Sequence, residues 1–170
     1  MRTMRNLELK ARLEDLARGE EIALAIGAKP GGDLYQLDTY FRVADGRLKL
    51  REDGRGGGEL VFYRRPEDSP TRWSDYFKVP VSSPETLRDV LTRALGVRRR
   101  IEKTRRLYRY RGARIHLDRV AGLGTFVEFE VPAEGDAEGP RATMSELMRA
   151  FGLSEADAIM ASYGEMAPEE

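Results

Sequence analysis

Four segments of the chain alternate strictly between apolar and polar residues, which is the pattern of a β-strand with one buried face. They cover residues 6–13, 47–51, 114–118 and 126–131. Four more segments are strand-like, mostly because they are rich in β-branched and aromatic residues. These cover residues 38–43, 59–65, 73–81 and 101–110. The pattern therefore predicts about eight strands, a number that can close a small barrel.

The connections between these strands favour antiparallel hairpins. Asp45 and Gly46 lie between two predicted strands and form a strong hairpin signal. Residues 54–58 form a glycine-rich loop between two more strands. This loop is not a phosphate-binding loop, because no Gly-Lys-Ser or Gly-Lys-Thr follows it and no helix begins there. We find no internal repeat and no clear linker, so the sequence predicts one domain over residues 1–170.

Apolar residues at helical spacing predict four amphipathic helices. The predicted helices are residues 13–26, residues 84–95, a segment that ends at Gly152 and a segment that starts at Ser154. Ser83 caps the second helix and Pro84 takes its first position. The fourth carries Ile159, Met160 and Tyr163. The expected class is α+β, with a closed eight-stranded antiparallel barrel and helices packed on its outside.

The charged strand faces allow two interpretations. An ordinary small barrel buries its apolar faces in the interior and leaves its charges in water. Two observations favour the opposite arrangement: the amphipathic helices need an apolar surface to cover, and the charged faces are sorted by sign. Carboxylates gather on strands at the two ends of the chain and cations on the strands between them. A charge-lined lumen is expensive unless something charged fills it, such as a polyphosphate with metal ions.

The charge distribution points to an anion site in the middle of the chain. Lys+Arg and Asp+Glu both number 29, so the balance gives no general case for a nucleic-acid partner or a membrane surface. Residues 98–119 are nevertheless strongly basic and residues after 133 are acidic. Without cysteine, the chain has no disulfide, zinc-thiolate or thiol nucleophile. No apolar run approaches about 20 residues, so we expect a soluble cytoplasmic protein.

A series of motifs along the chain is similar to one known family. CYTH proteins, or triphosphate tunnel metalloenzymes, begin with a strand that reads Glu-x-Glu-x-Lys, and Asn6, Glu8 and Lys10 take those places here. The remaining motifs follow in family order: DTYF at 38–41, GRLKLRE at 46–52, VFYRRP at 61–66, KTR at 103–105, ARIHLD at 113–118, GLGTFVEFE at 122–130 and ASY at 161–163. The chain therefore resembles a CYTH protein over nearly its whole length.

The resemblance implies a tunnel that holds a triphosphate together with divalent metals, Mg²⁺ or Mn²⁺. The metal ligands it implies are Glu8, Glu128, Glu130 and, at the first motif position, Asn6. The substrate-binding residues it implies are Lys10, Lys49, Arg51, Lys103, Arg105 and Arg114, together with Arg64 or Arg65. Catalytic roles fall to Glu8, Lys10 and Glu130, and Asp118 would orient a cation of the lumen. Asn6 departs from the family pattern because an amide brings no charge to a metal.

The branch resemblance is to class IV adenylate cyclases, which implies conversion of ATP to cyclic AMP and pyrophosphate. A triphosphatase acting on tripolyphosphate, thiamine triphosphate or a nucleoside triphosphate is the alternative, because one lumen permits both reactions. A non-catalytic polyphosphate- or nucleotide-binding module and a ligand-free structural barrel remain as further hypotheses. His116 shares a strand face with Arg114 and Asp118, but a single histidine is more often structural. The sequence carries no signal for the oligomeric state.

Overall fold

The computed structural model describes residues 4–64, 71–133 and 138–169 of the chain. In these ranges the strands are β1 (Met4–Arg12), β2 (Lys29–Phe41), β3 (Arg47–Glu52), β4 (Gly58–Arg64), β5 (Arg72–Val81), β6 (Val97–Tyr110), β7 (Ala113–Val120) and β8 (Gly124–Pro132). The helices are α1 (Leu16–Ala25), α2 (Pro84–Leu95), α3 (Glu138–Ala150) and the short α4 (Tyr163–Met166), with a 3₁₀ turn, η1 (Glu155–Asp157), between the last two.

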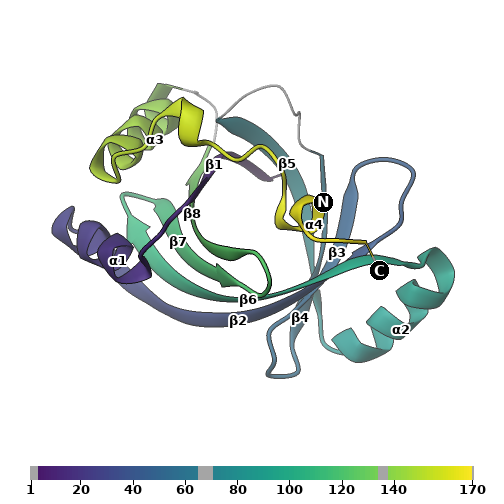
Figure 1. Cartoon of the computed structure of the whole chain (residues 1–170). Helices are drawn as coiled ribbons and strands as arrows, with labels where there is room; N and C mark the ends of the chain where they lie inside the picture. The colour runs from purple at the N-terminus through teal and green to yellow at the C-terminus, as the bar shows by residue number, and fades with distance from the viewer. Residues whose placement is uncertain (1–3, 65–70, 134–137, 170) are drawn as a thin grey trace.

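The strands close into an antiparallel barrel. Their order around the ring is β1-β5-β4-β3-β2-β6-β7-β8. The ring closes where β8 pairs with β1, with Phe129 opposite Leu9 and Val127 opposite Ala11. Figure 1 shows the helices arranged around the outside of the strands. The predicted α+β class, with a closed eight-stranded antiparallel barrel and external helices, is confirmed.

Strand β2 is longer than the sequence pattern predicts. The pattern predicts a strand only from Asp38, whereas β2 begins at Lys29 and pairs with most of β6. A shift of register between Pro30 and Gly32 accommodates the proline, because an irregular position in a strand tolerates a residue that cannot donate a ladder hydrogen bond. Proline and glycine near position 30 therefore mark a bulge inside a strand, although the same residues also commonly mark the end of a helix or strand.

The first three predicted helices form at their expected places. Helix α1 begins at Leu16, later than predicted, because the Asp15 side chain caps it by accepting a hydrogen bond from the Ala17 amide at 2.8 Å. Helix α2 has the predicted bounds, with Pro84 in its first turn and Gly96 at positive φ after its last residue. Among the described residues, no helix has the length and apolar character needed to cross a membrane.

The predicted fourth helix is wrong. The chain after Ser154 forms only the 3₁₀ turn η1 and then becomes extended, with the Ile159 amide donating to the Lys10 carbonyl at 2.7 Å. A capping box built by Ser162 and Glu165 starts the short α4 at Tyr163. Contact with β1 and a second helix start divide this segment, so its apolar residues face the barrel without forming a continuous helical stripe.

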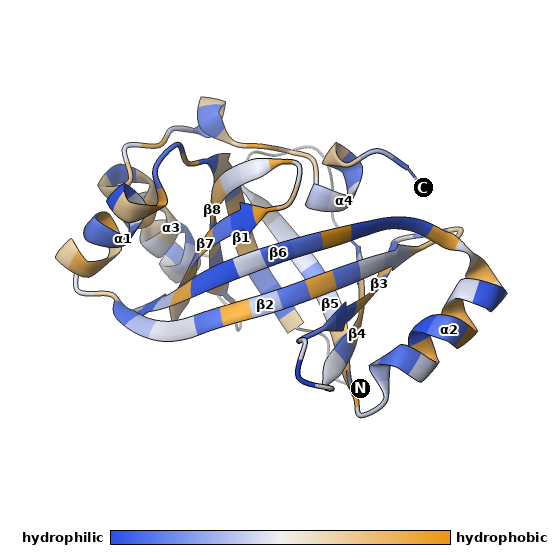
Figure 2. Ribbon diagram, turned by 60° about the horizontal axis from the view of Figure 1, so that its bottom comes forward, coloured by the Kyte–Doolittle hydropathy of each residue, from blue (hydrophilic) through white to orange (hydrophobic). Residues whose placement is uncertain are grey.

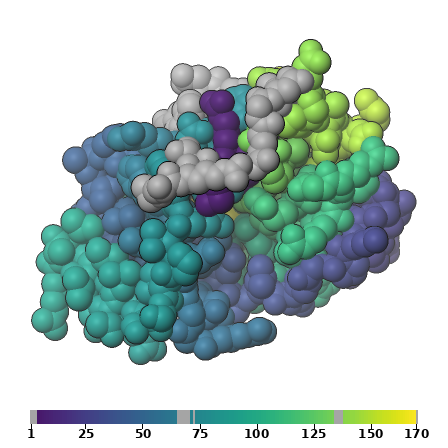
Figure 3. Space-filling view, turned by 180° about the vertical axis from the view of Figure 1, so that it is seen from behind, coloured from purple at the N-terminus to yellow at the C-terminus, as the bar shows by residue number. Residues whose placement is uncertain are grey.

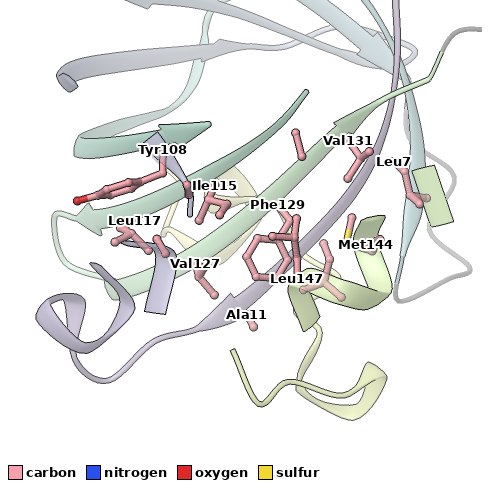
Figure 4. Packing of buried hydrophobic residues seen from close by; sticks show 14 residues of the cluster. Leu7, Ala11, Tyr108, Ile115, Leu117, Val127, Phe129, Val131, Met144 and Leu147 are labelled. Atoms are coloured by element: carbon pink, nitrogen blue, oxygen red, sulfur yellow. The ribbon is translucent and has the colours of Figure 1, made fainter. Parts of the chain in front are cut away.

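The main apolar core lies outside the barrel, between the strands and two helices. Leu7, Leu9 and Phe129 on the outer face of β1 and β8 are at most 2% exposed, and Met144 and Leu147 of α3 belong to the same cluster. Figure 4 shows Leu7, Phe129, Met144 and Leu147 gathered between the strands and the helix. The apolar strand faces therefore point outward to the helices and the charged faces point inward, which confirms the less usual of the two interpretations.

Helix α2 lies apart from this core. Figure 3 shows it, in teal, as a lobe at one side of the molecule, and Val90 on this helix is 56% exposed. Figure 2 shows the alternation of hydrophilic and hydrophobic residues along the long strands β2 and β6 that run beside each other. The same alternation that places apolar side chains under α1 and α3 places charged ones in the interior of the barrel.

Candidate active site in the barrel lumen

The barrel encloses a cavity whose walls are largely charged. The predicted residues that line it are Asn6, Glu8, Lys10, Lys49, Arg51, Lys103, Arg105, Glu128 and Glu130, from strands β1, β3, β6 and β8. Tyr40, Tyr63, Tyr76 and Tyr163 add aromatic surface. The structure thus brings together nearly all the residues that the sequence singles out, while their individual roles in binding and catalysis stay predictions.

One wall of the lumen is acidic because β1 and β8 are neighbours. Their register places Glu8 opposite Glu130 and Lys10 opposite Glu128. Burial alone would raise the pKa of Glu128, but Arg105 and Lys10 outweigh it and hold that pKa at about 2. The pKa of Glu130 is also lowered, since His116 and Arg114 act against the effect of burial. Both carboxylates are therefore ionised at neutral pH and available to a cation.

His116 of β7 completes this acidic wall. It lies directly opposite Glu128 in the ladder, and its Nδ1 is 3.9 Å from Glu130 Oε1. Desolvation and the nearby Arg105 lower its pKa to about 4, so the imidazole is neutral at physiological pH. Nδ1 is buried and has no hydrogen-bond partner among the described residues. His116, Glu128 and Glu130 each offer a ligand atom, and these atoms lie within 4.8 Å of one another.

The opposite wall is basic and is organised by one buried carboxylate. Asp38 of β2 accepts hydrogen bonds from Lys49 Nζ at 2.9 Å and from Arg51 Nε and Nη2 at 2.7 Å each. Lys103 Nζ is 3.7 Å from the same carboxylate. Burial would raise the pKa of Asp38, but the three cations hold it well below its usual range. One carboxylate thus positions the charged side chains of Lys49 and Arg51 and lies beside the amine of Lys103, which leaves the wall cationic.

Arg105 links the two walls through Asp118. It donates from Nε and Nη2 to the two oxygens of Asp118, both at 2.7 Å, and Nη2 also lies 3.3 Å from Glu128. Asp118 is fully buried, and Arg105 holds its pKa at about 2 against the effect of burial. Asp118 therefore fixes the orientation of the Arg105 guanidinium through two parallel hydrogen bonds. This contact is compatible with the expectation that Asp118 orients a cation of the lumen.

The C-terminal segment forms part of the cavity wall. The Tyr163 hydroxyl donates to Asp118 at 2.8 Å, and its ring centroid lies 4.1 Å from Lys10 Nζ. Lys10 also donates to the Ala161 carbonyl at 3.1 Å. The first strand and the last helix thus meet at Lys10, which stands between Glu128 and the tyrosine ring.

Asn6 and Arg114 lie together beside Glu130. Both polar groups of the buried Asn6 amide are satisfied when its oxygen accepts from Arg114 Nη2 at 3.3 Å and its nitrogen donates to the Arg5 carbonyl at 3.2 Å. Arg114 also donates to Glu130, with Nε 2.9 Å from Oε2. Asn6 therefore lines the cavity, but its oxygen faces an arginine.

The structure places one predicted cation outside the lumen. Arg64 is exposed and donates to Asp45 at the far end of its hairpin, since its strand parity is opposite to that of the lumen-facing Tyr63. The prediction that Arg64 lines the phosphate path is therefore not supported. Arg65, the other residue named for that position, lies outside the described residues.

Sequence reasoning gave no site role to three residues that hold or complete the walls. It placed His116 on the face of Arg114 and Asp118 but favoured a structural role for it. It did not single out Asp38, which strand register places opposite Arg51. Tyr163 was assigned to a helix that does not form, and no local pattern predicts that it bonds to Asp118. These three residues hold or complete the charged walls.

The donor set of the acidic wall fits a divalent metal. Carboxylate oxygens suit Mg²⁺ and Mn²⁺, and a neutral imidazole nitrogen suits Mn²⁺ and its later neighbours in the first transition row. The buried Nδ1 of His116, without a protein partner in the described chain, is an atom that such an ion would satisfy. The residues present are therefore compatible with the metal that the fold implies.

Comparison with known proteins identifies the family. The CYTH domain model matches residues 4–163. "Putative adenylate cyclase MJ0240" of Methanocaldococcus jannaschii is 26% identical over 175 residues, which covers 96% of this chain and 98% of that protein. The PH1012 protein of Pyrococcus horikoshii has a similar structure, with a TM-score of 0.86, 22% identity and coverage of 96% and 99%. "Putative adenylyl cyclase HpAC1" of Hippeastrum, reported to have a dominant triphosphatase activity, has a TM-score of 0.64 and 16% identity. The match covers 87% of this chain and 88% of that one. The chain belongs to the CYTH domain family.

Proposed function

We propose that this chain is a metal-dependent enzyme that converts ATP to cyclic AMP and pyrophosphate inside the barrel. Family membership supports the processing of a triphosphate. The observation that carries the proposal is the division of one lumen into a cationic wall around Asp38 and an acidic wall around Glu128. A triphosphate with a divalent cation is a ligand that neutralises both walls at once.

The cationic wall would bind the phosphate oxygens. Lys49, Arg51 and Lys103 are buried or nearly so around one carboxylate, and this carboxylate neutralises only part of the charge of Lys49 and Arg51. Arginine can bond phosphate oxygens in pairs, and burial strengthens each interaction relative to water. Because Asp38 already holds these side chains in place, little ordering remains to be done when the substrate arrives.

The acidic wall would hold the metal. Glu8, Glu128 and Glu130 are the carboxylates of the lumen that the resemblance assigns to this role, and Glu128 and Glu130 are ionised. A bound Mg²⁺ or Mn²⁺ would supply positive charge that offsets the charge of the phosphate oxygens. Lys10, paired across the ladder with Glu128, lies where the two walls meet and is the predicted catalytic cation.

Cyclisation needs one bond to form and one to break. The ribose 3′-oxygen attacks the α-phosphorus, the bond from that phosphorus to the bridging oxygen breaks, and the hydroxyl proton ends on the released pyrophosphate. The cations around Asp38 would hold the β- and γ-phosphates, which become the leaving group. The tyrosines of the cavity wall offer a surface on which an adenine ring could stack. The name of the Methanocaldococcus jannaschii relative supports this choice of reaction.

Hydrolysis of a triphosphate is the second candidate. The same walls would serve if water attacked a terminal phosphorus, and the triphosphatase activity reported for the Hippeastrum protein favours it. The decisive experiment incubates the protein with ATP, tripolyphosphate or thiamine triphosphate in the presence of Mg²⁺ or Mn²⁺ and measures cyclic AMP, pyrophosphate and phosphate. Equal amounts of cyclic AMP and pyrophosphate from ATP would support the cyclase.

Other results of this panel have definite meanings. Phosphate release without cyclic AMP would replace the cyclase by a triphosphatase. Binding of a triphosphate without any product would leave a polyphosphate- or nucleotide-binding module. If the protein neither bound nor turned over any of these triphosphates, the proposal would be wrong.

A further inference from the structure

We propose that Nδ1 of His116 is a direct ligand of the divalent metal, so that one imidazole joins the carboxylates of the acidic wall, with Glu128 and Glu130 nearest to it. This inference rests on the proposed function, because it assumes a metal in the lumen. It assigns to β7 a ligand that takes the place of the carboxylate missing at Asn6.

The first argument is the position of the three side chains. His116 and Glu128 are directly opposite each other on β7 and β8, and Glu130 follows on the same face of β8. Their ligand atoms lie within 4.8 Å of one another, and Nδ1 is 3.9 Å from Glu130 Oε1. In an octahedral site with bonds of about 2.1 Å, neighbouring ligands are about 3 Å apart and opposite ones about 4.2 Å. A small contraction would therefore bring all three to one ion.

The second argument is the environment of the imidazole. His116 is 4% exposed, and its Nδ1 has no hydrogen-bond partner in the part of the chain that the structure describes. A buried polar atom in this state costs free energy unless something satisfies it. His116 lies opposite Glu128 in the ladder and its Nδ1 is 3.9 Å from Glu130 Oε1, so a cation held by these two carboxylates would lie within reach of this atom.

The third argument is the position of Asn6. Its amide oxygen accepts from Arg114 in the orientation that satisfies both of its polar groups. A metal ligand at this position would have to leave the arginine, which also bonds Glu130. The geometry therefore favours a centre displaced from β1 toward β7 and β8, with His116 as the additional donor.

A nitrogen ligand changes the choice of metal. Magnesium prefers an all-oxygen environment, whereas manganese and cobalt bind imidazole readily. We therefore expect the protein to prefer Mn²⁺ or Co²⁺ over Mg²⁺ by a larger factor than an all-carboxylate site would.

The direct test is pulsed electron paramagnetic resonance of bound Mn²⁺. His116 is the one histidine of the sequence, so growth with ¹⁵N-histidine in otherwise unlabelled medium marks a single residue. The full chain is loaded with Mn²⁺, with and without tripolyphosphate, and the nitrogen modulation of the spin echo is recorded. We expect ¹⁴N coupling in the unlabelled protein and its replacement by ¹⁵N coupling in the labelled protein.

The outcomes separate this inference from the proposed function. Bound Mn²⁺ and normal turnover without coupling to the labelled histidine would overturn the inference and leave the proposed function intact. Failure to bind Mn²⁺, with or without tripolyphosphate, would overturn both.

A second measurement tests the same inference by affinity. In His116→Gln, the dissociation constant for Mn²⁺ should rise at least tenfold, while that for Mg²⁺ changes less than threefold. If His116 only oriented Glu130, both constants would change by the same factor, and that result would contradict direct ligation. Glu146→Gln, on the outer helix α3, is the matched control and should change neither constant.

Discussion

The hydroxyl of Tyr163 donates a hydrogen bond to Asp118 at 2.8 Å, which joins the last helix of the chain to the interior of the barrel. The same Asp118 carboxylate fixes Arg105, and the tyrosine ring packs over Lys10. The C-terminal segment is therefore part of the site, and its removal would disturb charged residues on two walls.

Tyr163→Phe keeps the ring and removes this hydrogen bond. We expect the free energy of unfolding to fall by about 1–2 kcal/mol, because a buried carboxylate loses a donor. The melting temperature should fall by roughly 2–8 °C. The control is Tyr110→Phe, which removes an exposed hydroxyl that donates to Glu146 at 3.2 Å. Equal melting temperatures for the two variants would show that the buried bond contributes nothing.

Glu128→Gln removes one charged ligand of the proposed metal. Activity should fall at least tenfold, equivalent to about 1.4 kcal/mol or more of transition-state stabilisation. The metal concentration for half-maximal rate should rise, because an amide attracts a cation less than a carboxylate does. Glu146→Gln on the outside of the barrel should change neither value. Full activity of the unaltered protein in excess chelator would contradict a metal-dependent mechanism.

Lys103 carries a stability cost that can be measured. Burial, followed by Arg105 and Arg51, holds its pKa well below the usual range. Between that lowered pKa and about 10.4, the unfolded chain binds the proton more tightly than the folded protein does. Lys103 therefore lowers the free energy of unfolding, and this cost is largest at pH values below its lowered pKa. The cost disappears as pH rises from that pKa to about 10.4.

Lys103→Met should remove this cost. We expect the free energy of unfolding at pH 7 to rise by about 1–2 kcal/mol and its dependence on alkaline pH to become flatter. Turnover should be lost, because the cation is part of the phosphate-binding wall. Thermal unfolding at pH 7 and pH 9 measures the gain in stability and its dependence on pH. Lys29→Met, at an exposed position, is the control. A lower stability for Lys103→Met at both values would disprove this account.

Substrate binding should charge Lys103. A triphosphate placed against its amine favours the protonated form, so the protein should take up a proton from buffer when it binds tripolyphosphate. Calorimetric titrations at pH 8, in two buffers of different ionisation enthalpy, give the number of protons. We expect uptake by the unaltered protein and a clear reduction in Lys103→Met. Identical proton numbers for the two proteins would assign the uptake to another group.

The two sides of the β3–β4 hairpin should differ in their effect on binding. Lys49 faces the lumen and bonds Asp38, whereas Arg64 is exposed and bonds Asp45. Lys49→Gln should weaken tripolyphosphate binding at least tenfold, about 1.4 kcal/mol, and Arg64→Gln should leave it unchanged. Isothermal titration of both variants gives the comparison. Equal losses would mean that the phosphate path extends beyond the cavity.

The barrel could be predicted from sequence because side chains alternate between the two faces of a strand, whatever that strand packs against. Leu7 and Leu9 alternate with Glu8 and Lys10, so one decision about which face is buried fixes the whole of β1. That decision could not come from alternation, which is the same for either orientation. The need of the helices for an apolar surface and the sorting of charges favour one orientation, the resemblance to CYTH proteins implies it, and the contacts of α3 confirm it.

The parts that failed depend on contacts between distant segments. Residues after Ser154 have apolar spacing, but pairing of Ile159 with β1 competes with helix formation there. The role of Asp38 in organising the basic wall depends on three basic side chains from two other strands. No local sequence pattern reports these contacts. The unpartnered state of His116 Nδ1 likewise follows from how β7 and β8 are aligned, and a single position in a sequence does not show it.

The closure of the ring by β1 and β8 also requires the two ends of the barrel sequence to meet. Glu8 and Glu130 become neighbours only when the first and last strands pair, which is the contact of longest sequence separation in the barrel. Strands β2 to β6 can align their cations on Asp38 before that pairing, so the anion-binding wall can exist in a chain that still lacks the acidic one. Mn²⁺ binding during refolding would therefore report the final closure, and a chain interrupted before β8 would attract polyanions without being able to hold a metal.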